Sequence, residues 1–97
     1  MPQPPYQVRC SQVVAESLRQ LQRRASRAGY GELVLEAFRL VVERLKADPS
    51  ELGEPLYRLP VLRMQVRLGI VPPLVVDFAV SEDHPLVIIR GIKSQRE

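Results

Sequence analysis

The chain has 97 residues, of which 45% are hydrophobic and 26% charged, and its formal net charge at pH 7 is +3. These values are typical of one globular domain and exclude a chain that is mainly disordered. Of the 14 basic residues, 12 are arginine, whose planar guanidinium suits phosphate and carboxylate partners. A genome that favours arginine codons gives the same count, so both interpretations stay open.

A single cysteine, Cys10, excludes an internal disulfide and a zinc cluster, and we expect it to be buried as a small apolar side chain. Residues 1–5 contain no apolar run and do not resemble a signal peptide. The most apolar stretch, from Ile70 to Val76, is too short to span a bilayer. We therefore expect a cytoplasmic protein without a membrane partner. It should fold as one domain over residues 1–97, with a flexible tail at 1–5 and a frayed end at 94–97.

The first predicted element is a strand from Tyr6 to Cys10, where apolar and polar residues alternate. Ser11 then suits the N-cap of a helix from Gln12 to Ala28. Gly29 suits the turn that follows, and a second helix is predicted from Glu32 to Ala47. Because this turn is short, the helices should form an antiparallel hairpin. Their apolar residues recur every three or four positions and define two buried stripes. The stripes are Val14, Leu18, Leu21, Ala25 and Ala28, and Val34, Phe38, Val41 and Leu45.

Three strands are predicted after the polar loop from Ser50 to Pro55. In the first, from Leu62 to Leu68, all even positions are apolar and all odd positions polar. The second and third, from Leu74 to Val80 and from Leu86 to Ile92, are rich in β-branched residues. Short links between them predict antiparallel hairpins. The sequence thus predicts an α+β fold of order β-α-α-β-β-β, an antiparallel sheet with the two-helix hairpin packed on one face.

The alternation from Leu62 to Leu68 also predicts which side chains face the helices. The even positions should point at the helices, so that Arg63, Gln65 and Arg67 project from the opposite face. A symmetric hairpin would add Asp77 near Gln65 on that same face. We expect this polar, arginine-bearing face to carry the function.

The order of these elements and three short segments resemble the RelE/ParE toxin superfamily of bacterial toxin–antitoxin systems, from Tyr6 to Lys93. The segments are Asp48-Pro49, the lead-in from Gly53 to Leu59 and the strand from Met64 to Gly69. The resemblance implies a small cytoplasmic toxin that an antitoxin peptide neutralises. In the RelE branch the toxin cuts ribosome-bound mRNA, and Arg and Lys neutralise the scissile phosphate. In the ParE branch it inhibits DNA gyrase and needs no nuclease site.

For RelE-like cleavage the resemblance points first to Arg67, which matches the arginine before the central hairpin turn. Lys93 and Arg90 are the cations nearest to the second expected arginine, and Arg63 is a further catalytic candidate. The motif is degraded, because residues 71–73 replace the usual Tyr-Arg and the chain ends without the family's terminal tyrosine. Two functions therefore remain open. One is a ribosome-dependent mRNA endonuclease of a type II toxin–antitoxin system, and the other is a catalytically inactive homologue that binds protein or nucleic acid.

A second basic group lies on the first predicted helix, where Arg19, Arg23 and Arg27 are spaced four residues apart beside Arg24. Such a row can bind nucleic acid along its phosphates. It can equally be a solvated helix face whose arginine stems cover apolar surface. His84 lies in a polar turn with no second histidine, so we expect no metal site and no small-molecule cofactor.

Overall fold

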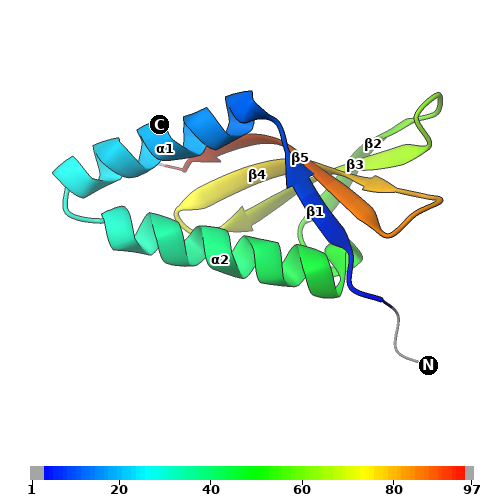
Figure 1. Cartoon of the computed structure of the whole chain (residues 1–97), viewed down its shortest axis with the longest axis horizontal. Coiled ribbons are helices and arrows are strands. Elements are labelled where there is room, and N and C mark those ends of the chain that lie inside the picture. Colours follow the sequence, from blue (N-terminus) through cyan, green and yellow to red (C-terminus); the bar gives the residue numbers. More distant parts are fainter. Residues whose placement is uncertain (1–3, 96–97) are drawn as a thin grey trace.

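The computed structural model describes residues 4–95 (Figure 1). In chain order its elements are β1 (Gln7–Cys10), α1 (Gln12–Arg27), α2 (Gly31–Ala47), the 3-10 turn η1 (Pro49–Glu51), β2 (Glu54–Leu59), β3 (Met64–Val71), β4 (Leu74–Ser81) and β5 (Leu86–Ser94). Residues 1–3 of the predicted tail and residues 96–97 of the predicted frayed end lie outside the described part. Within it, Ser94 is buried in β5, and the Gln95 amide donates to the Pro73 carbonyl at 2.8 Å. That hydrogen bond joins Gln95 to the turn between β3 and β4.

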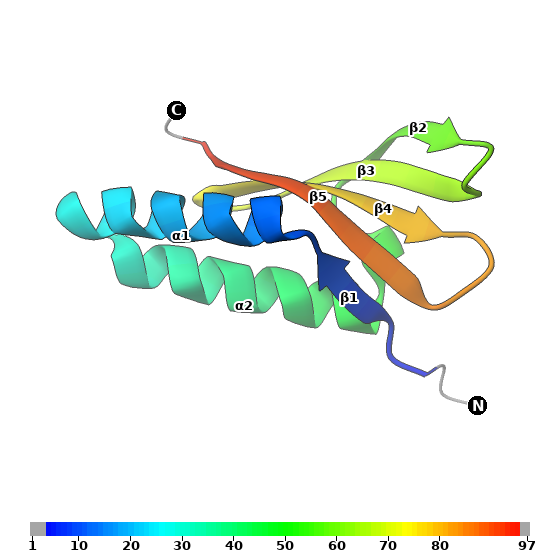
Figure 2. The ribbon, with the colours of Figure 1, turned by 45° about the horizontal axis from the view of Figure 1, so that its top comes forward.

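Both helices form where the apolar spacing predicts them. The Ser11 hydroxyl accepts a hydrogen bond from the Val14 amide at 3.2 Å and so satisfies one of the free donors of the first turn. Directly after α1, Gly29 adopts a φ of +90°, a left-handed geometry that favours glycine. The two helices form a hairpin and lie on the same side of the sheet (Figure 2). The predicted helical hairpin on one sheet face is therefore confirmed.

The sheet is mixed rather than purely antiparallel, with strands in the order β1-β5-β4-β3-β2. β1 runs parallel to β5, whereas every other neighbouring pair is antiparallel. A parallel pair needs a long crossover, and the segment from α1 to β4 supplies one. The edge strand β2 covers residues 54–59, for which the sequence predicts a loop and a lead-in. Gly53 and Pro55 make this stretch look like a loop, but an edge strand tolerates a proline beside a bulge.

The main core lies between the helices and one sheet face. It joins the apolar stripes of α1 and α2 to inward side chains of β4 and β5, and Phe78 is fully buried within it. Phe38 packs against this core and is only half-buried. Ala28, predicted as the last member of the first stripe, is exposed just beyond the end of α1.

β3 presents its side chains to the faces opposite to those predicted. Val66 lies opposite Ala79, and Arg67 lies opposite Phe78 of the main core. Directly opposed residues of a sheet project from the same face. Arg67 is therefore on the helix side and Val66 on the other side, so the predicted assignment of faces is wrong. A shift of one residue in such an assignment moves every side chain of the strand.

The apolar residues of β3 are buried all the same, in a second cluster on the face without helices. Met64, Val66 and Ala79 form this cluster, and Leu59 and Ile88 pack against it. Leu62, predicted as the first core residue of the strand, is exposed in the preceding turn. Gln65 and Asp77 are also not neighbours on one face, because their partners are Val80 and Leu68.

Two further expectations concern surface properties. Cys10 is exposed at the last position of β1, which corrects the prediction of a buried thiol. The chain leaves the sheet directly after Cys10 to begin α1, and at this strand end the thiol is not covered by the core. Over residues 4–95, no helix combines the length and apolarity needed to cross a membrane.

Candidate functional site

The sheet face turned away from α1 and α2 carries the candidate site, and we call it the open face. The strand pairings assign residues to it, because opposed side chains share a face. Its members include Tyr57, Val66, Leu68, Val75, Asp77, Ala79, Ile88, Gly91 and Lys93.

An irregularity in β5 adds Arg90 to the open face. Asp77 pairs with Gly91 and Phe78 pairs with Ile89, so Arg90 is an extra residue with no partner on β4. A bulge of this kind redirects a side chain and is common beside functional sites. The Arg90 guanidinium reaches both Tyr57 and Asp77, two members of the open face.

The contact between Arg90 and Tyr57 crosses the open face. Nη1 of Arg90 donates to the Tyr57 hydroxyl at 3.1 Å, and its Cζ lies 5.9 Å from the centre of the ring, within cation–π range. This hydrogen bond, and then the charge of Asp77, hold the pKa of Arg90 above its ordinary value, so the side chain remains cationic. β3 and β4 separate the strands of these two residues. The long side chains of Tyr57 and Arg90 therefore meet by leaning toward each other over these two strands.

Asp77 is the acidic member of the site. Its Oδ1 lies 3.7 Å from Nη1 of Arg90, close enough for ionic attraction and too far for a hydrogen bond. Oδ1 is shielded from solvent and has no hydrogen-bond partner, although 37% of the Asp77 side chain is exposed. A shielded carboxylate oxygen attracts a neighbouring cation more strongly than one in bulk water. Asp77 is thus attracted to the charge of Arg90, while its Oδ1 accepts no hydrogen bond.

A shallow hollow of about 280 Å³ lies next to Asp77 on the open face. Leu68 and Val75 contribute apolar walls, and Lys93 adds an exposed cation. Gly91 has no side chain there, and a methyl group added to it would contact only the Asp77 Cβ, at 3.9 Å. The open face therefore combines two cations, a hydroxyl, a carboxylate and apolar side chains.

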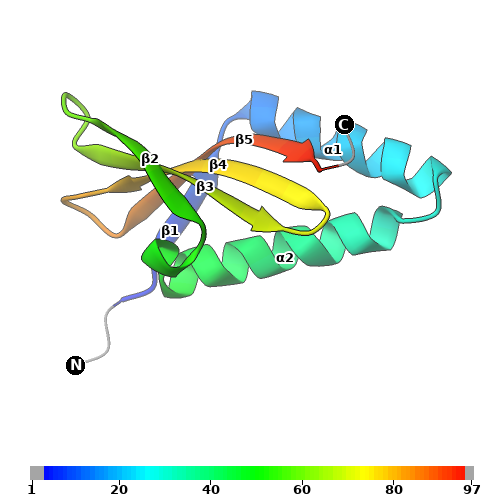
Figure 3. The ribbon, with the colours of Figure 1, turned by 180° about the vertical axis from the view of Figure 1, so that it is seen from behind.

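Arg67, the first catalytic candidate from the sequence, is not part of this group. Its guanidinium donates to the backbone carbonyls of Ser50 at 2.9 Å, Leu52 at 3.3 Å and Gly53 at 2.9 Å. These carbonyls belong to η1 and the chain leading into β2, which begin beside the C-terminal end of α2 (Figure 3). The prediction that Arg67 projects from the face opposite the helices is wrong. In this arrangement Arg67 ties a loop to the sheet.

Arg63 lies apart from the open-face group as well. It occupies the turn between β2 and β3 with a φ of +53°, and its Nε contacts Asp83 Oδ2 at 2.9 Å. Arg58 makes a two-point contact with Glu82 in the next hairpin, with Nη2 at 2.7 Å from Oε1. That hydrogen bond is the main reason why the pKa of Glu82 lies below its ordinary value. The two ion pairs join the tips of neighbouring hairpins.

The arginine row of α1 is exposed along its length. Nη1 of Arg19 contacts Oε2 of Glu16 at 2.7 Å, which lowers the pKa of that carboxyl group. Arg23, Arg24 and Arg27 continue the row toward the end of the helix. Because α1 covers the other side of the sheet, this row and the open face form separate basic surfaces (Figure 2).

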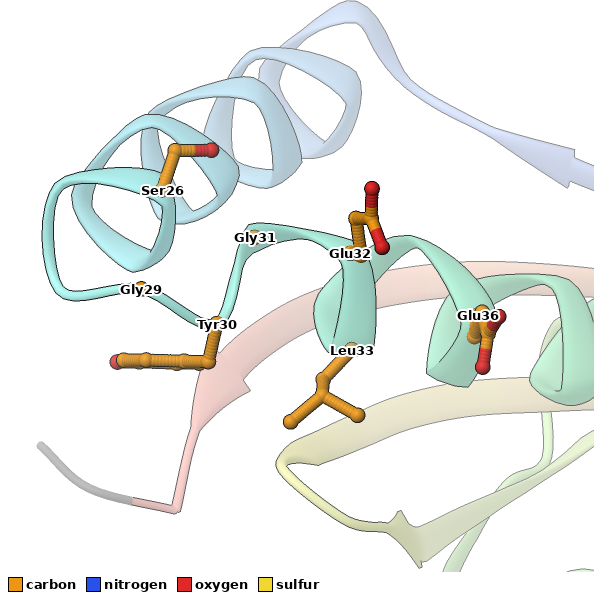
Figure 4. Close-up of a pocket in the computed structure, with 7 residues that line it drawn as sticks. All are labelled: Ser26, Gly29, Tyr30, Gly31, Glu32, Leu33 and Glu36. Atoms are coloured by element: carbon orange, nitrogen blue, oxygen red, sulfur yellow. The ribbon is translucent and has the colours of Figure 1, made fainter.

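A larger hollow, of about 440 Å³, lies at the turn between the two helices (Figure 4). Its lining includes the carboxylates of Glu32 and Glu36 and the side chains of Ser26, Tyr30 and Leu33. Two carboxylates without a lining cation make this hollow unsuited to a phosphate. Over residues 4–95, no group of three His, Cys, Asp or Glu side chains is arranged to hold a metal ion.

Sequence reasoning missed Tyr57 and the bulge at Arg90. Tyr57 stands in a stretch where Tyr57 and Leu59 alternate with Arg58, a weak strand signal that was available. No sequence pattern around Arg90 predicts the bulge, because a bulge depends on how two strands pair. Of the four predicted catalytic cations, the fold brings Arg90 and Lys93 to the open face and separates Arg67 and Arg63 from them.

No protein-family model matches the sequence, and no curated protein matches it in sequence comparison. Solved structures do match. A chain of the toxin–antitoxin complex RelBE2 from Mycobacterium tuberculosis is 17% identical, with a TM-score of 0.68 over 97% of this chain and 95% of that one. A chain of the archaeal RelE–RelB complex from Pyrococcus horikoshii OT3 is 15% identical, with a TM-score of 0.68 over 94% and 96%. The chain therefore has a RelE-like α+β fold, as its sequence predicts.

Proposed function

We propose that this chain is a cytoplasmic RelE-like toxin of a type II toxin–antitoxin system, which cleaves ribosome-bound mRNA on its open face. The shared fold supports the proposal. The observation that carries it is the Arg90–Tyr57 pair, which a strand bulge places on the same open face as Lys93.

The chemistry of RNA cleavage suits these residues. When a 2′-hydroxyl attacks the neighbouring phosphate, its proton passes to solvent water, the bond from phosphorus to the 5′ oxygen of the next nucleotide breaks, and a 2′,3′-cyclic phosphate forms. Negative charge builds up on the phosphate oxygens in this step, and a fixed cation stabilises the transition state. Arg90 supplies the cation, held on a strand rather than on a loop. The Tyr57 oxygen accepts a hydrogen bond from Arg90, which leaves its own O–H proton free to donate to the phosphate or the leaving oxygen. Tyr57 would then supply the hydroxyl that the resemblance expects from a terminal tyrosine.

Lys93 and the arginine row of α1 have different tasks in this proposal. Lys93, on the rim of the hollow, would bind a neighbouring phosphate of the mRNA. Arg19, Arg23, Arg24 and Arg27 would contact ribosomal or messenger RNA from the other side of the molecule, through phosphates and without reading bases. Arg67 and Arg63 remain secondary catalytic candidates, since each would first have to leave its carbonyl or carboxylate partners.

The partner that would neutralise such a toxin is an antitoxin. Both similar structures are complexes that contain an antitoxin or RelB chain. We therefore expect a short antitoxin gene next to the gene for this chain, and co-expression of the two proteins should restore growth.

A specific observation favours the alternative, a catalytically inactive homologue that binds protein or nucleic acid. Two of the four expected cations, Arg67 and Arg63, are engaged in contacts that hold the fold together. Arg90 in turn lies 3.7 Å from a carboxylate oxygen of Asp77, which would compete with a phosphate for its charge. A binding module needs only the surface, whereas a nuclease needs the transition-state contacts as well.

Inducible expression in bacteria separates the two functions. Wild type should arrest growth and cut ribosome-bound mRNA, and Arg90→Ala should remove both effects while the protein still accumulates and folds. Arg39→Ala, at an exposed position on α2, is the matched control and should remain toxic. Normal growth and intact mRNA on expression of the wild type would reject the nuclease function and leave the binding module.

A further inference from the structure

Asp77 occupies an unexpected place for a carboxylate, inside the surface that would bind a polyanion. It lies on β4 directly opposite Gly91, and Arg90 is the extra residue next to that pair. Its shielded Oδ1 faces Arg90 Nη1 at 3.7 Å and lacks a hydrogen bond. If the carboxylate served only to hold Arg90 in place, a hydrogen-bonded contact of about 2.8 Å would do so better. The contact with Tyr57, at 3.1 Å, already positions the guanidinium.

We propose that Asp77 sets the phosphate affinity of the open face by competing with the ligand for the charge of Arg90. For a phosphate that approaches Arg90, part of the attraction of the guanidinium is already taken up by the carboxylate. The ligand class is a phosphodiester of single-stranded RNA, so this inference rests on the proposed function. Asp77 acts through Arg90 and is a residue that tunes affinity, not a catalytic residue.

The surroundings of Asp77 leave room for this competition. A methyl group added to Gly91 would contact only the Asp77 Cβ, at 3.9 Å, so the space at Gly91 is open. Lys93 provides a second cation at the edge of the same hollow. An anion bound by Lys93 in this hollow would therefore lie beside Asp77. Weakened binding suits an enzyme that must release its product, because binding substrate and transition state equally tightly does not raise the turnover rate.

The test is binding of a fluorescently labelled single-stranded RNA of about ten nucleotides, measured by anisotropy at low salt with the full chain. Asp77→Asn keeps the size of the side chain and removes its charge, and we expect it to bind about fivefold more tightly than wild type. Arg90→Ala should bind more weakly. The double variant should match Arg90→Ala, because Asp77 acts through Arg90. Glu43→Gln, which removes an exposed negative charge from α2, should change the affinity less than twofold.

Three results would overturn the inference. They are equal or weaker binding by Asp77→Asn, a gain that persists undiminished without Arg90, and no measurable RNA binding by wild type and Asp77→Asn alike. If Asp77→Asn does not fold, as judged by thermal unfolding, Asp77→Ser provides the same loss of charge with a smaller side chain. The assay does not measure cleavage. A gain in affinity through Arg90, in a protein that cuts no RNA, would reject the nuclease function and support the role of Asp77.

Discussion

Replacement of Arg67 by alanine should lower the stability of the fold. An arginine that only projected from a strand into solvent would contribute almost nothing to that stability. Arg67 donates to three backbone carbonyls, of which the contact with Leu52 is partly buried and those with Ser50 and Gly53 are exposed. We assign about 1.5 kcal/mol to the partly buried, charge-assisted hydrogen bond and about 0.5 kcal/mol to each exposed one. Arg67→Ala should therefore lower the free energy of unfolding by about 2.5 kcal/mol. For a domain of this size that corresponds to a fall in Tm of roughly 10 to 20 °C.

Urea denaturation and thermal unfolding of the purified protein measure this loss. Arg39→Ala, an exposed arginine on α2, is the control and should change stability by less than about 0.5 kcal/mol. Arg67→Lys should recover only part of the loss, because a compact ammonium does not span carbonyls that the planar guanidinium reaches together. A loss below about 0.5 kcal/mol in Arg67→Ala would refute the structural role. A loss of toxicity in Arg67→Ala should therefore be interpreted only after folding has been checked.

Three further predictions follow from single positions. Phe78→Ala should lower the free energy of unfolding in urea by about 3 to 5 kcal/mol, and Phe38→Ala clearly less, because Phe78 is fully buried and Phe38 half-buried. Equal losses would contradict this arrangement of the core. Gly53→Ala should lower Tm strongly, because φ is +71° and an added Cβ would collide with the Leu68 carbonyl; an unchanged Tm would mean that β2 can shift away from β3. The pKa of Glu82 lies below its ordinary 4.5, chiefly through Arg58, so this stabilisation is present above pH 4.5 and is lost as pH falls. In Arg58→Gln the Tm should consequently be lower at neutral pH and fall less steeply on acidification, and parallel Tm curves would exclude this contribution.

Local sequence patterns predicted the helices of this fold well because the signals of a helix are local. The spacing of Val14, Leu21 and Ala25 defines a buried face, and the Ser11 cap and Gly29 mark its two ends. The loop-like Gly53 and Pro55 hid β2, since their fit to an edge strand depends on pairing with β3. The parallel pairing of β1 with β5 could not be predicted either, because it depends on how distant segments of the chain are arranged and not on a local pattern.

The site was less predictable than the fold, for a physical reason that β3 illustrates. Its alternation shows that one set of side chains is buried, but it cannot say on which face of the sheet that set lies. Val66 is buried on the open face, in a small cluster with Met64 and Ala79. Arg67 therefore appeared to be a free functional cation, although it binds three carbonyls on the helix side.

The central claim is that the Arg90–Tyr57 pair on the open face stabilises the transition state of RNA cleavage. The direct measurement is single-turnover cleavage of ribosome-bound mRNA by purified protein, for wild type, Arg90→Ala, Tyr57→Phe and Arg39→Ala. We predict that Arg90→Ala lowers the rate at least about 100-fold, the usual effect of removing one donor to a developing oxyanion. Tyr57→Phe should lower the rate too, and Arg39→Ala should cut as wild type does. Equal rates for wild type and a folded Arg90→Ala variant would contradict the claim.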